Sequence, residues 1–183
     1  MIQQKLEPYE IYCDGSCKGN GAKLALGAWA YCILFDNSLV RKDCGGIPQT
    51  TNQRMELTAA LEAIKGALEL TKYSKGNTYN IYSDSAYLIN CYSQGWYIGW
   101  EQNGWRNAAK QEVKNQDLWI QLLPFFKNKN FHFFKVKGHS TNHYNNFVDK
   151  MAQDAAKQFE KKGLSYGGTP IWEIEELKQY VQS

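Results

Sequence analysis

The stretch TTNQRMELTAALEAIKGALEL, residues 50–70, and the stretch TYNIYSD, residues 78–84, decide the fold class. Apolar residues in the first stretch recur at helical spacing, at Leu57, Ala60, Leu61, Ile64 and Leu68. This spacing predicts a helix from about residue 52 to residue 70. The second stretch is short and aromatic, which predicts a strand that ends at Asp84. A long helix that leads into a strand is typical of α/β proteins.

Three more strands are predicted before the helix, at Tyr9–Cys13, Gly27–Phe35 and Leu39–Cys44. Asp36 and Asn37 form a turn signal between the last two, so these strands should pair as an antiparallel hairpin. The run Asp14-Gly15-Ser16 after the first strand is also typical of a turn. The chain therefore opens with three strands that we expect to be antiparallel.

After residue 84 the chain continues to alternate between helix and strand. The predicted elements are a helix that starts at Ser85, a short helix or projecting segment within residues 95–105, a helix at Asp117–Phe126, a strand at Phe131–Val136 and a final helix at Asn145–Lys161. We therefore expect an α/β fold with a five-stranded mixed sheet, three antiparallel strands followed by two parallel ones, flanked by helices.

The length of 183 residues, with 43% hydrophobic and 14% aromatic residues, fits one globular domain with its own core. The same composition excludes a disordered or collagen-like chain. It changes after residue 162, where Gly167, Gly168 and Pro170 follow closely. We expect one domain at residues 1–162 and a C-terminal appendage at residues 163–183, whose role the sequence does not define.

The sequence has no run of about 18 apolar residues, which a membrane span requires, and its first residues lack the apolar core of a signal peptide. We therefore expect a cytoplasmic protein, and a monomer. The five cysteines are odd in number and irregularly spaced, which favours reduced thiols over disulfides. They include no Cys-x-x-Cys pair, which disfavours a zinc site.

The formal net charge of +3 is too small to identify a polyanionic ligand, so the distribution of charge is more informative. Basic residues gather within residues 127–150, as Lys127, Lys129, Lys135, Lys137 and Lys150, with Asp149 the only acidic residue there. Such a stripe is consistent with phosphate contacts, and equally with an ordinary solvated surface.

Four acidic residues, Asp14, Glu56, Asp84 and Asp149, lie close to predicted strand ends or helix starts. Singly, such residues are usually turn formers or helix caps, and Glu56 also fits a solvated helix face. The ends of parallel strands, however, meet at one edge of a sheet, where ligand sites form. Four carboxylates gathered there would repel one another unless a cation neutralised them, and oxygen ligands without cysteine favour Mg²⁺ or Mn²⁺ over Zn²⁺. Spacing alone does not show that the four meet.

These residues belong to longer motifs that resemble those of a known family. The motifs are Asp14-Gly15-Ser16-Cys17-Lys18-Gly19-Asn20, Thr50 to Leu57, Ser83-Asp84-Ser85, and Val136-Lys137-Gly138-His139 with Asp149 ten residues later. In this order and spacing they are similar to type 1 ribonuclease H, the bacterial and eukaryotic form with a substrate-binding protrusion. The resemblance covers residues 9 to 160. The positions Trp96, Trp100, Trp105 and Asp117-Leu118-Trp119 resemble the region around the protrusion.

The resemblance implies a ribonuclease H-like fold and hydrolysis of the RNA strand of an RNA–DNA hybrid, with 5′-phosphate and 3′-hydroxyl ends as products. It implies that two Mg²⁺ ions, with Mn²⁺ as a possible substitute, are bound by Asp14, Glu56, Asp84 and Asp149. His139 would assist proton transfer or product release.

The resemblance also implies a set of substrate contacts. A protein distinguishes RNA from DNA by the 2′-hydroxyl groups, and contacts to sugars and phosphates carry no sequence information, so cleavage should be largely sequence-independent. The matching positions are Asn20, Asn52 and Gln53 for the sugars and bases of the hybrid, Thr51 for a DNA-strand phosphate, and Trp96 and Trp105 on the protrusion.

The chain departs from the family pattern in two places. Ala86 stands where the family often has glutamine after Asp-Ser, which removes an amide that would read the minor groove. The segment around the protrusion is sparsely basic, with Arg106, Lys110 and Lys114. These departures predict weaker and more salt-sensitive hybrid binding, shifted towards the lysines of residues 127–137.

Three alternatives share the fold, since a fold does not determine a function. The first is a non-catalytic hybrid- or duplex-binding module, which would be expected to lack at least one of the four carboxylates. The second is the nuclease part of a reverse transcriptase. The third is a structure-selective relative such as an integrase or resolvase, although no motif here favours a DNA substrate.

Overall fold

The computed structural model describes residues 6–19 and 25–162 of the chain. Within these residues, five strands form one mixed sheet of order β3-β2-β1-β4-β5. The strands are β1 (Tyr9–Lys18), β2 (Leu26–Phe35), β3 (Ser38–Pro48), β4 (Tyr79–Ser83) and β5 (Phe131–Lys135). The helices are α1 (Asn52–Leu70), α2 (Ala86–Gln94), α3 (Trp96–Gln102), α4 (Gln116–Phe126) and α5 (His143–Lys162). The predicted order of elements and the predicted fold class are confirmed.

Strand pairing also agrees with the prediction. β1 pairs with β2, and β2 with β3, in antiparallel fashion, whereas β4 pairs in parallel with β1 and β5. The hairpin between β2 and β3 turns at Asp36 and Asn37, whose φ angles of 48° and 60° are the left-handed values that a tight hairpin turn requires.

The end of β1 differs from the prediction. The strand does not stop at Cys13 but continues to Lys18, and Asp14 to Lys18 pair with Ala30 to Leu26 of β2. The turn predicted at Asp14-Gly15-Ser16 is therefore wrong, because β2 supplies hydrogen-bond partners along the whole segment. Gly15 serves close packing instead: a Cβ atom there would lie 2.3 Å from the backbone carbonyl carbon of Met55 in α1.

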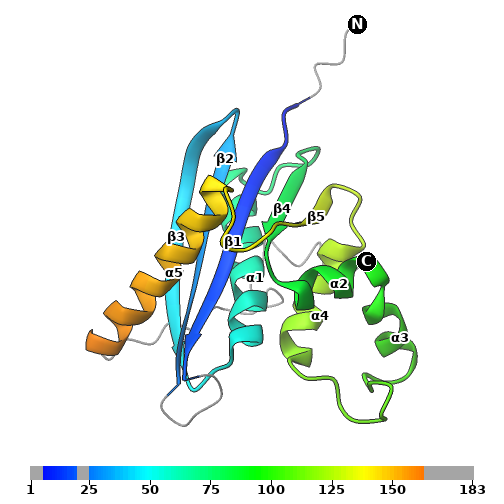
Figure 1. The fold of residues 1–183 in the computed structure, drawn as a ribbon. Coiled ribbons are helices and arrows are strands. Elements are labelled where there is room, and N and C mark those ends of the chain that lie inside the picture. The colour runs from blue at the N-terminus through cyan, green and yellow to red at the C-terminus, as the bar shows by residue number, and fades with distance from the viewer. Residues whose placement is uncertain (1–5, 20–24, 163–183) are drawn as a thin grey trace, which may run out of the picture.

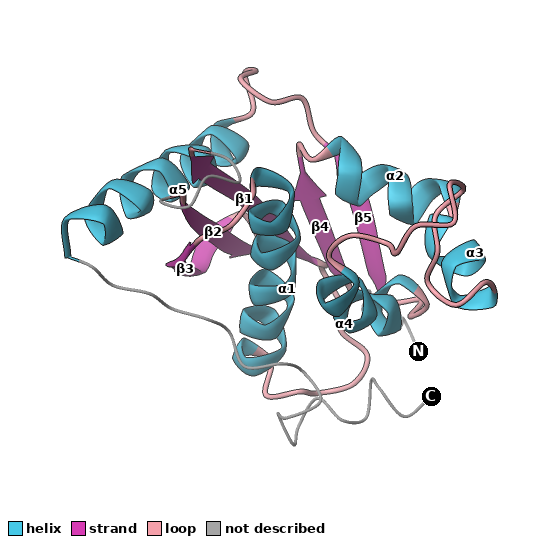
Figure 2. Cartoon of the chain, turned by 90° about the horizontal axis from the view of Figure 1, so that it is seen from below, coloured by secondary structure: helices cyan, strands magenta, loops and turns pink. Residues whose placement is uncertain are grey.

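The helices cover the two faces of the sheet unequally (Figures 1 and 2). Behind the sheet in Figure 1, α1 packs on β1 and β2, and Trp29, Tyr31 and Ile33 of β2 join the main core there. On the front face α5 crosses β1, β2 and β3, and Ala28 packs against Ala155 and Ala156 in a small second cluster. Alternate residues of β1 and β2 therefore face different helices.

The boundaries of the helices agree with the sequence to within about two residues. α1 begins after Thr51, whose hydroxyl oxygen accepts a hydrogen bond from the Arg54 backbone N–H. α5 begins two residues earlier than predicted, at His143, and the Asn142 side chain accepts a hydrogen bond from the backbone N–H of Asn145. Among the helices of residues 6–19 and 25–162, none combines the length and the apolar character that a membrane crossing needs.

Candidate active site

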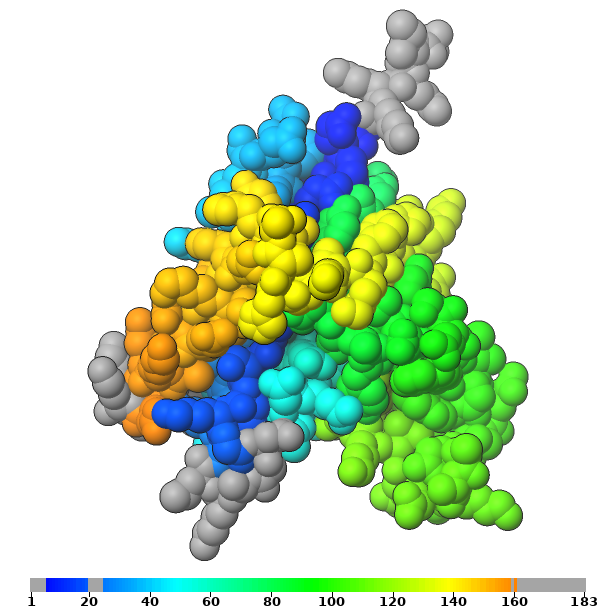
Figure 3. Space-filling view, viewed as in Figure 1, coloured from blue at the N-terminus to red at the C-terminus, as the bar shows by residue number. Residues whose placement is uncertain are grey.

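One pocket brings the four predicted carboxylates together. Asp14, Glu56, Asp84 and Asp149 all line it, with His139 beside them; Gly15, Ser16, Cys17, Asn52 and Gln153 complete the lining. In Figure 3 the cyan start of α1 lies between the blue end of β1, the green residues that follow β4 and the yellow start of α5. The convergence that spacing alone left open is therefore present.

The sheet places Asp14 and Asp84 side by side. The parallel register of β1 and β4 runs from Tyr9 opposite Tyr79 to Tyr12 opposite Tyr82. Because both aspartates lie two residues beyond the last of these pairs, they reach the same level of the sheet. Asp14 is only 6% exposed, and its carboxylate accepts a hydrogen bond of 2.9 Å from the Gly15 backbone N–H.

Glu56 reaches the pocket from the second turn of α1. The absence of a side chain at Gly15 lets β1 approach this turn, since a Cβ atom there would lie 2.4 Å from the Glu56 backbone nitrogen. The Ser85 hydroxyl donates to one carboxylate oxygen of Glu56, and the Asn52 amide donates to the other at 3.1 Å. Glu56 is thus half-buried and held on both sides, so the interpretation of it as a solvated surface residue is wrong.

Asp149 and His139 close the pocket from the side of α5. Gln153, one turn further along α5, donates to Asp149 at 2.9 Å. The His139 Nδ1 atom lies 3.8 Å from an Asp149 oxygen, and its side chain is 85% exposed at the rim. Its loop passes close to Asp84, because a Cβ atom on Gly138 would lie 2.7 Å from an Asp84 oxygen. A side chain at residue 138 would therefore crowd the carboxylate.

The pocket concentrates negative charge in a partly buried place. Burial, followed by the neighbouring charges of Asp84 and Asp149, raises the pKa of Asp14 to about 9. Burial also raises the pKa of Glu56, although the hydrogen bond from Ser85 opposes this shift. This crowding is the condition under which a cation binds favourably.

The donor set fits a hard divalent cation, because four carboxylates supply oxygen ligands. Among the described residues, no three histidine, cysteine, aspartate or glutamate side chains already converge as ligands of a single ion. Part of the reason is local, since Ser85 and Asn52 hold Glu56 and Gln153 holds Asp149. The residues present therefore suit Mg²⁺ or Mn²⁺ in chemistry, and their side chains would have to turn towards it.

A second pocket lies beside the first, at the N-terminus of α1. Its lining consists of Thr51, Asn52, Gln53, Lys114 and Asn115, and Asn52 belongs to both pockets. The sequence predicted the first three as substrate contacts and missed the last two. Asn115 has a φ of 58° directly before α4, and a left-handed position favours asparagine. An asparagine before a helix was the available signal.

The other predicted substrate residues do not line these pockets. Trp96 and Trp105 belong to a chain of aromatic rings that joins α3 to the core through Trp100 and Trp119. Both are half-buried, so packing occupies much of their surface. Asn20 lies outside the described residues, as does the predicted appendage at residues 163–183.

The predicted stripe of lysines is divided by the fold. Lys127 pairs with Glu101 at 2.8 Å, and Lys129 lines a hollow at the opposite end of the sheet. Lys135 lies at the active-site end, where it donates to the Asp84 backbone carbonyl at 2.7 Å, and Lys137 follows in the exposed loop. Only the later part of the stripe is therefore near the acidic pocket.

Solved structures share this architecture. LC9-RNase H1, described as a type 1 RNase H with the type 2 active-site motif, superposes with a TM-score of 0.68 at 24% identity, over 84% of this chain and 74% of that one. LC11-RNase H1, solved in complex with an RNA/DNA hybrid, superposes with a TM-score of 0.62 at 18% identity, over 82% and 97%. At these identities the likeness establishes the class of protein by its fold, the ribonuclease H fold.

Sequence comparison establishes the family. Residues 7–157 match the family model described as RNase H. The ribonuclease H of Chlorobium luteolum is 42% identical over 148 residues, which cover 81% of this chain and 94% of that protein. That of Caldanaerobacter subterraneus subsp. tengcongensis is 41% identical over 157 residues, covering 85% and 95%. The chain belongs to the ribonuclease H family, whose enzymes cleave the RNA of RNA–DNA hybrids and generally depend on metal ions.

Proposed function

We propose that this chain is an endonuclease that hydrolyses the RNA strand of RNA–DNA hybrids by a two-metal-ion mechanism, largely independently of sequence. The products would carry 5′-phosphate and 3′-hydroxyl ends. The observation that carries the proposal is the single pocket lined by four carboxylates from β1, α1, the end of β4 and α5. All four would be needed to bind two divalent ions.

Asp14, Glu56, Asp84 and Asp149 would hold two Mg²⁺ ions, with Mn²⁺ as a possible substitute. When bound, these ions lower the pKa of the attacking water and stabilise charge on the reacting phosphate and the leaving oxygen. Ser85 and Asn52 hold Glu56 at the pocket, and Gln153 holds Asp149, so these carboxylates would have to turn from their present hydrogen bonds to bind the ions. The exposed His139 would accept or deliver a proton beside Asp149, or assist product release.

The second pocket would bind the substrate on the side of the DNA strand. The Thr51 hydroxyl, the Asn115 amide and the Lys114 ammonium are suitable donors to a phosphate. Asn52 and Gln53, exposed at the start of α1, would contact the sugars and bases, with the 2′-hydroxyl groups as the marker of RNA. Trp96 and Trp105 are proposed as contacts on the side of α3, and Asn20 stays a prediction. Such contacts position a duplex without reading its sequence.

A parallel assay with one labelled RNA strand tests the proposal. The strand is offered in Mg²⁺ as an RNA–DNA hybrid, as an RNA duplex and as a single strand, to the wild-type protein and to Asp84→Asn. We expect cleavage of the hybrid alone, with 5′-phosphate ends, and loss of cleavage in the variant. Hybrid binding without cleavage by the wild type would instead support a non-catalytic binding module.

The proposal includes a monomer in the cytoplasm. One chain supplies all four carboxylates to its own pocket, so the site needs no second copy. Within residues 6–19 and 25–162 no cysteine forms a disulfide, which suits a reducing compartment. Sedimentation of the purified protein at assay concentration would test the monomer, and fractionation of the cells that produce it would test the compartment.

A further inference from the structure

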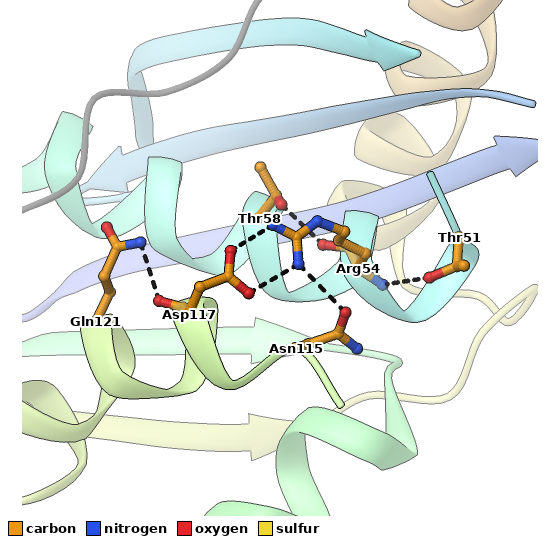
Figure 4. Close-up of polar contacts among 6 residues, drawn as sticks. All are labelled: Thr51, Arg54, Thr58, Asn115, Asp117 and Gln121. Carbon is orange, nitrogen blue, oxygen red and sulfur yellow. Dashed lines mark hydrogen bonds and ion pairs between the residues drawn. The ribbon is translucent and has the colours of Figure 1, made fainter. Parts of the chain in front are cut away.

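Arg54 joins the start of α1 to the start of α4 (Figure 4). Its guanidinium pairs with both carboxylate oxygens of Asp117, in the first turn of α4; the Nη1 to Oδ1 distance is 2.9 Å. The same Nη1 atom donates to the side-chain oxygen of Asn115 at 3.3 Å. Its partners lie 61 and 63 residues further along the chain, so a tertiary contact fixes the residue that precedes α4.

This contact determines which way the Asn115 amide points. A guanidinium carries only donors, so the atom of Asn115 that faces it must be the carbonyl oxygen. The amide nitrogen, with its two N–H groups, is then directed away from Arg54, as Figure 4 shows. Asn115 lines the second pocket together with Thr51, Asn52 and Gln53. The left-handed backbone of Asn115, which asparagine adopts readily, places this side chain directly before α4, within reach of Arg54.

Arg54 also leaves Thr51 free to donate. The backbone N–H of Arg54 donates to the Thr51 hydroxyl oxygen at 3.2 Å, which fixes the hydroxyl while its hydrogen remains available. The guanidinium itself is engaged by Asp117 and Asn115, and Asp117 compensates its charge. Arg54 is therefore poorly placed to serve as a phosphate ligand, whereas Thr51 and Asn115 are well placed to donate to a phosphate.

We propose that Arg54 is a positioning residue for the hybrid: by holding the Asn115 side-chain oxygen, it directs the Asn115 amide nitrogen towards the phosphate that the second pocket is proposed above to bind. The inference rests on the proposed function, because it takes the hybrid as the ligand of this pocket. Arg54 acts through Asn115 and touches neither the reacting phosphate nor the acidic pocket.

The first test compares hybrid affinity among variants by fluorescence anisotropy in EDTA, a condition that separates binding from turnover. Arg54→Lys keeps the positive charge but cannot pair with both Asp117 oxygens and reach Asn115 at once. We expect Kd to rise by about three- to tenfold in Arg54→Lys and by about tenfold in Asn115→Ala. The double variant should bind no more weakly than Asn115→Ala alone, with kcat in Mg²⁺ at saturating hybrid retained in Arg54→Lys.

A matched control lies at the other end of α1. Arg41 pairs with Glu69 at 2.7 Å, and its side chain is 29% exposed, compared with 34% for Arg54. Arg41→Lys should leave Kd unchanged, whatever it does to the melting temperature. Melting temperatures of all variants ensure that affinities are measured on folded protein. If Arg54 served only stability, its loss would lower the melting temperature and leave Kd unchanged, which would overturn the inference.

A chemical change in the substrate identifies the contact. Single methylphosphonate groups, which are uncharged, are placed at successive positions of the DNA strand. A methylphosphonate at one of these positions should weaken hybrid binding by the wild type about tenfold. The same substitution should weaken hybrid binding by Arg54→Lys and Asn115→Ala much less. Equal losses in all three proteins, or additive losses in the double variant, would overturn the inference. Failure of the wild type to bind or cleave the hybrid would overturn the proposed function itself, a result that the variants cannot mimic.

Discussion

The two pockets share α1 and Asn52, but they handle charge in opposite ways. In the acidic pocket, Asp14, Asp84 and Asp149 face one another without a basic partner strong enough to keep the pKa of Asp14 low. In the second pocket the nearby carboxylate, Asp117, is paired with Arg54, whose hydrogen bonds lower the pKa of Asp117. The negative charge of the acidic pocket requires a cation from solution, whereas the charge of Asp117 beside the second pocket is already neutralised by Arg54. The comparison predicts that cleavage and binding respond differently to the same treatment.

Removal of divalent ions should have the largest effect and should separate the two pockets directly. We expect EDTA to abolish hybrid cleavage, because four carboxylates without a cation cannot stabilise the reacting phosphate. The circular dichroism spectrum and hybrid binding through the second pocket should persist. Loss of the spectrum in EDTA would instead indicate a structural metal and would remove the distinction between the pockets.

Asp14→Asn should have the next largest effect. Removal of one carboxylate from the acidic pocket should lower kcat by more than about 1000-fold in saturating Mg²⁺. The melting temperature in EDTA should not fall, since burial and two like charges already disfavour the ionised form of Asp14, and an amide of the same shape carries no charge at all. Hybrid affinity in EDTA should remain close to that of the wild type. Activity retained at saturating Mg²⁺ would contradict the assignment of the site.

Gly15→Ala tests how the scaffold holds the acidic pocket together. The added Cβ atom would lie 2.3 to 2.5 Å from backbone atoms of Met55 and Glu56, which cannot rotate away. We expect a loss of about 2–3 kcal/mol in the free energy of unfolding. A fall in kcat of at least about tenfold should follow, because Glu56 is displaced. Gly99→Ala is the matched control, since a Cβ atom there would meet nothing within 4 Å, and urea unfolding should show no loss of stability, because alanine is favoured over glycine within a helix.

The same glycine shows where the sequence was informative and where it was not. Periodicity predicted α1, the hairpin at Asp36 and the order of all elements, because each depends on local spacing. It failed at Gly15, since a glycine required for close packing against α1 looks the same as a glycine in a turn. The difference depends on β2 and α1, which are distant in the sequence.

The candidate site divides in a similar way. Asp14, Glu56, Asp84 and Asp149 were singled out by their places near predicted strand ends and helix starts and then by family motifs, and the structure was needed to show that they share a pocket. Asn115 was missed because its significance comes from Arg54, 61 residues earlier in the chain. No local pattern encodes such a pair, although the complementary charges of Arg54 and Asp117 become evident once α1 and α4 are adjacent.

The salt dependence of hybrid binding sharpens the comparison further. Lys114 lines the second pocket, and Lys137 lies in the exposed loop beside Asp84 and His139. Replacement of either by glutamine should reduce the slope of log affinity against log salt by about 0.7 to 0.9, the value for one lost phosphate contact. Lys129→Gln, at the opposite end of the sheet, should leave the slope unchanged. Equal effects at all three positions would indicate a diffuse electrostatic attraction instead.

The smallest expected effect is the contribution of the Arg54–Asp117 ion pair to the free energy of unfolding, and this contribution depends on pH. Because Arg54 lowers the pKa of Asp117, the folded state holds this carboxylate ionised more strongly than the unfolded state does. The ion pair therefore contributes stability above the ordinary aspartate pKa of about 4, and that contribution is lost as the pH falls below it. The Asp117 side chain is 55% exposed, so solvent screening limits the contribution to less than about 1 kcal/mol.

Urea unfolding of the wild type and Asp117→Asn, at pH 7 and near pH 3, measures this contribution. Asp117→Asn should be less stable at pH 7, and the difference should shrink as the pH falls towards 3, because the unfolded wild-type chain then binds a proton at this carboxyl group more readily than the folded protein does. An equal difference at both values of pH would mean that the pair stabilises α4 by shape and hydrogen bonding alone. In that case the charge of Arg54 would be free to attract phosphate, and the contrast between a pocket that needs a cation and a pocket balanced by its own residues would no longer hold.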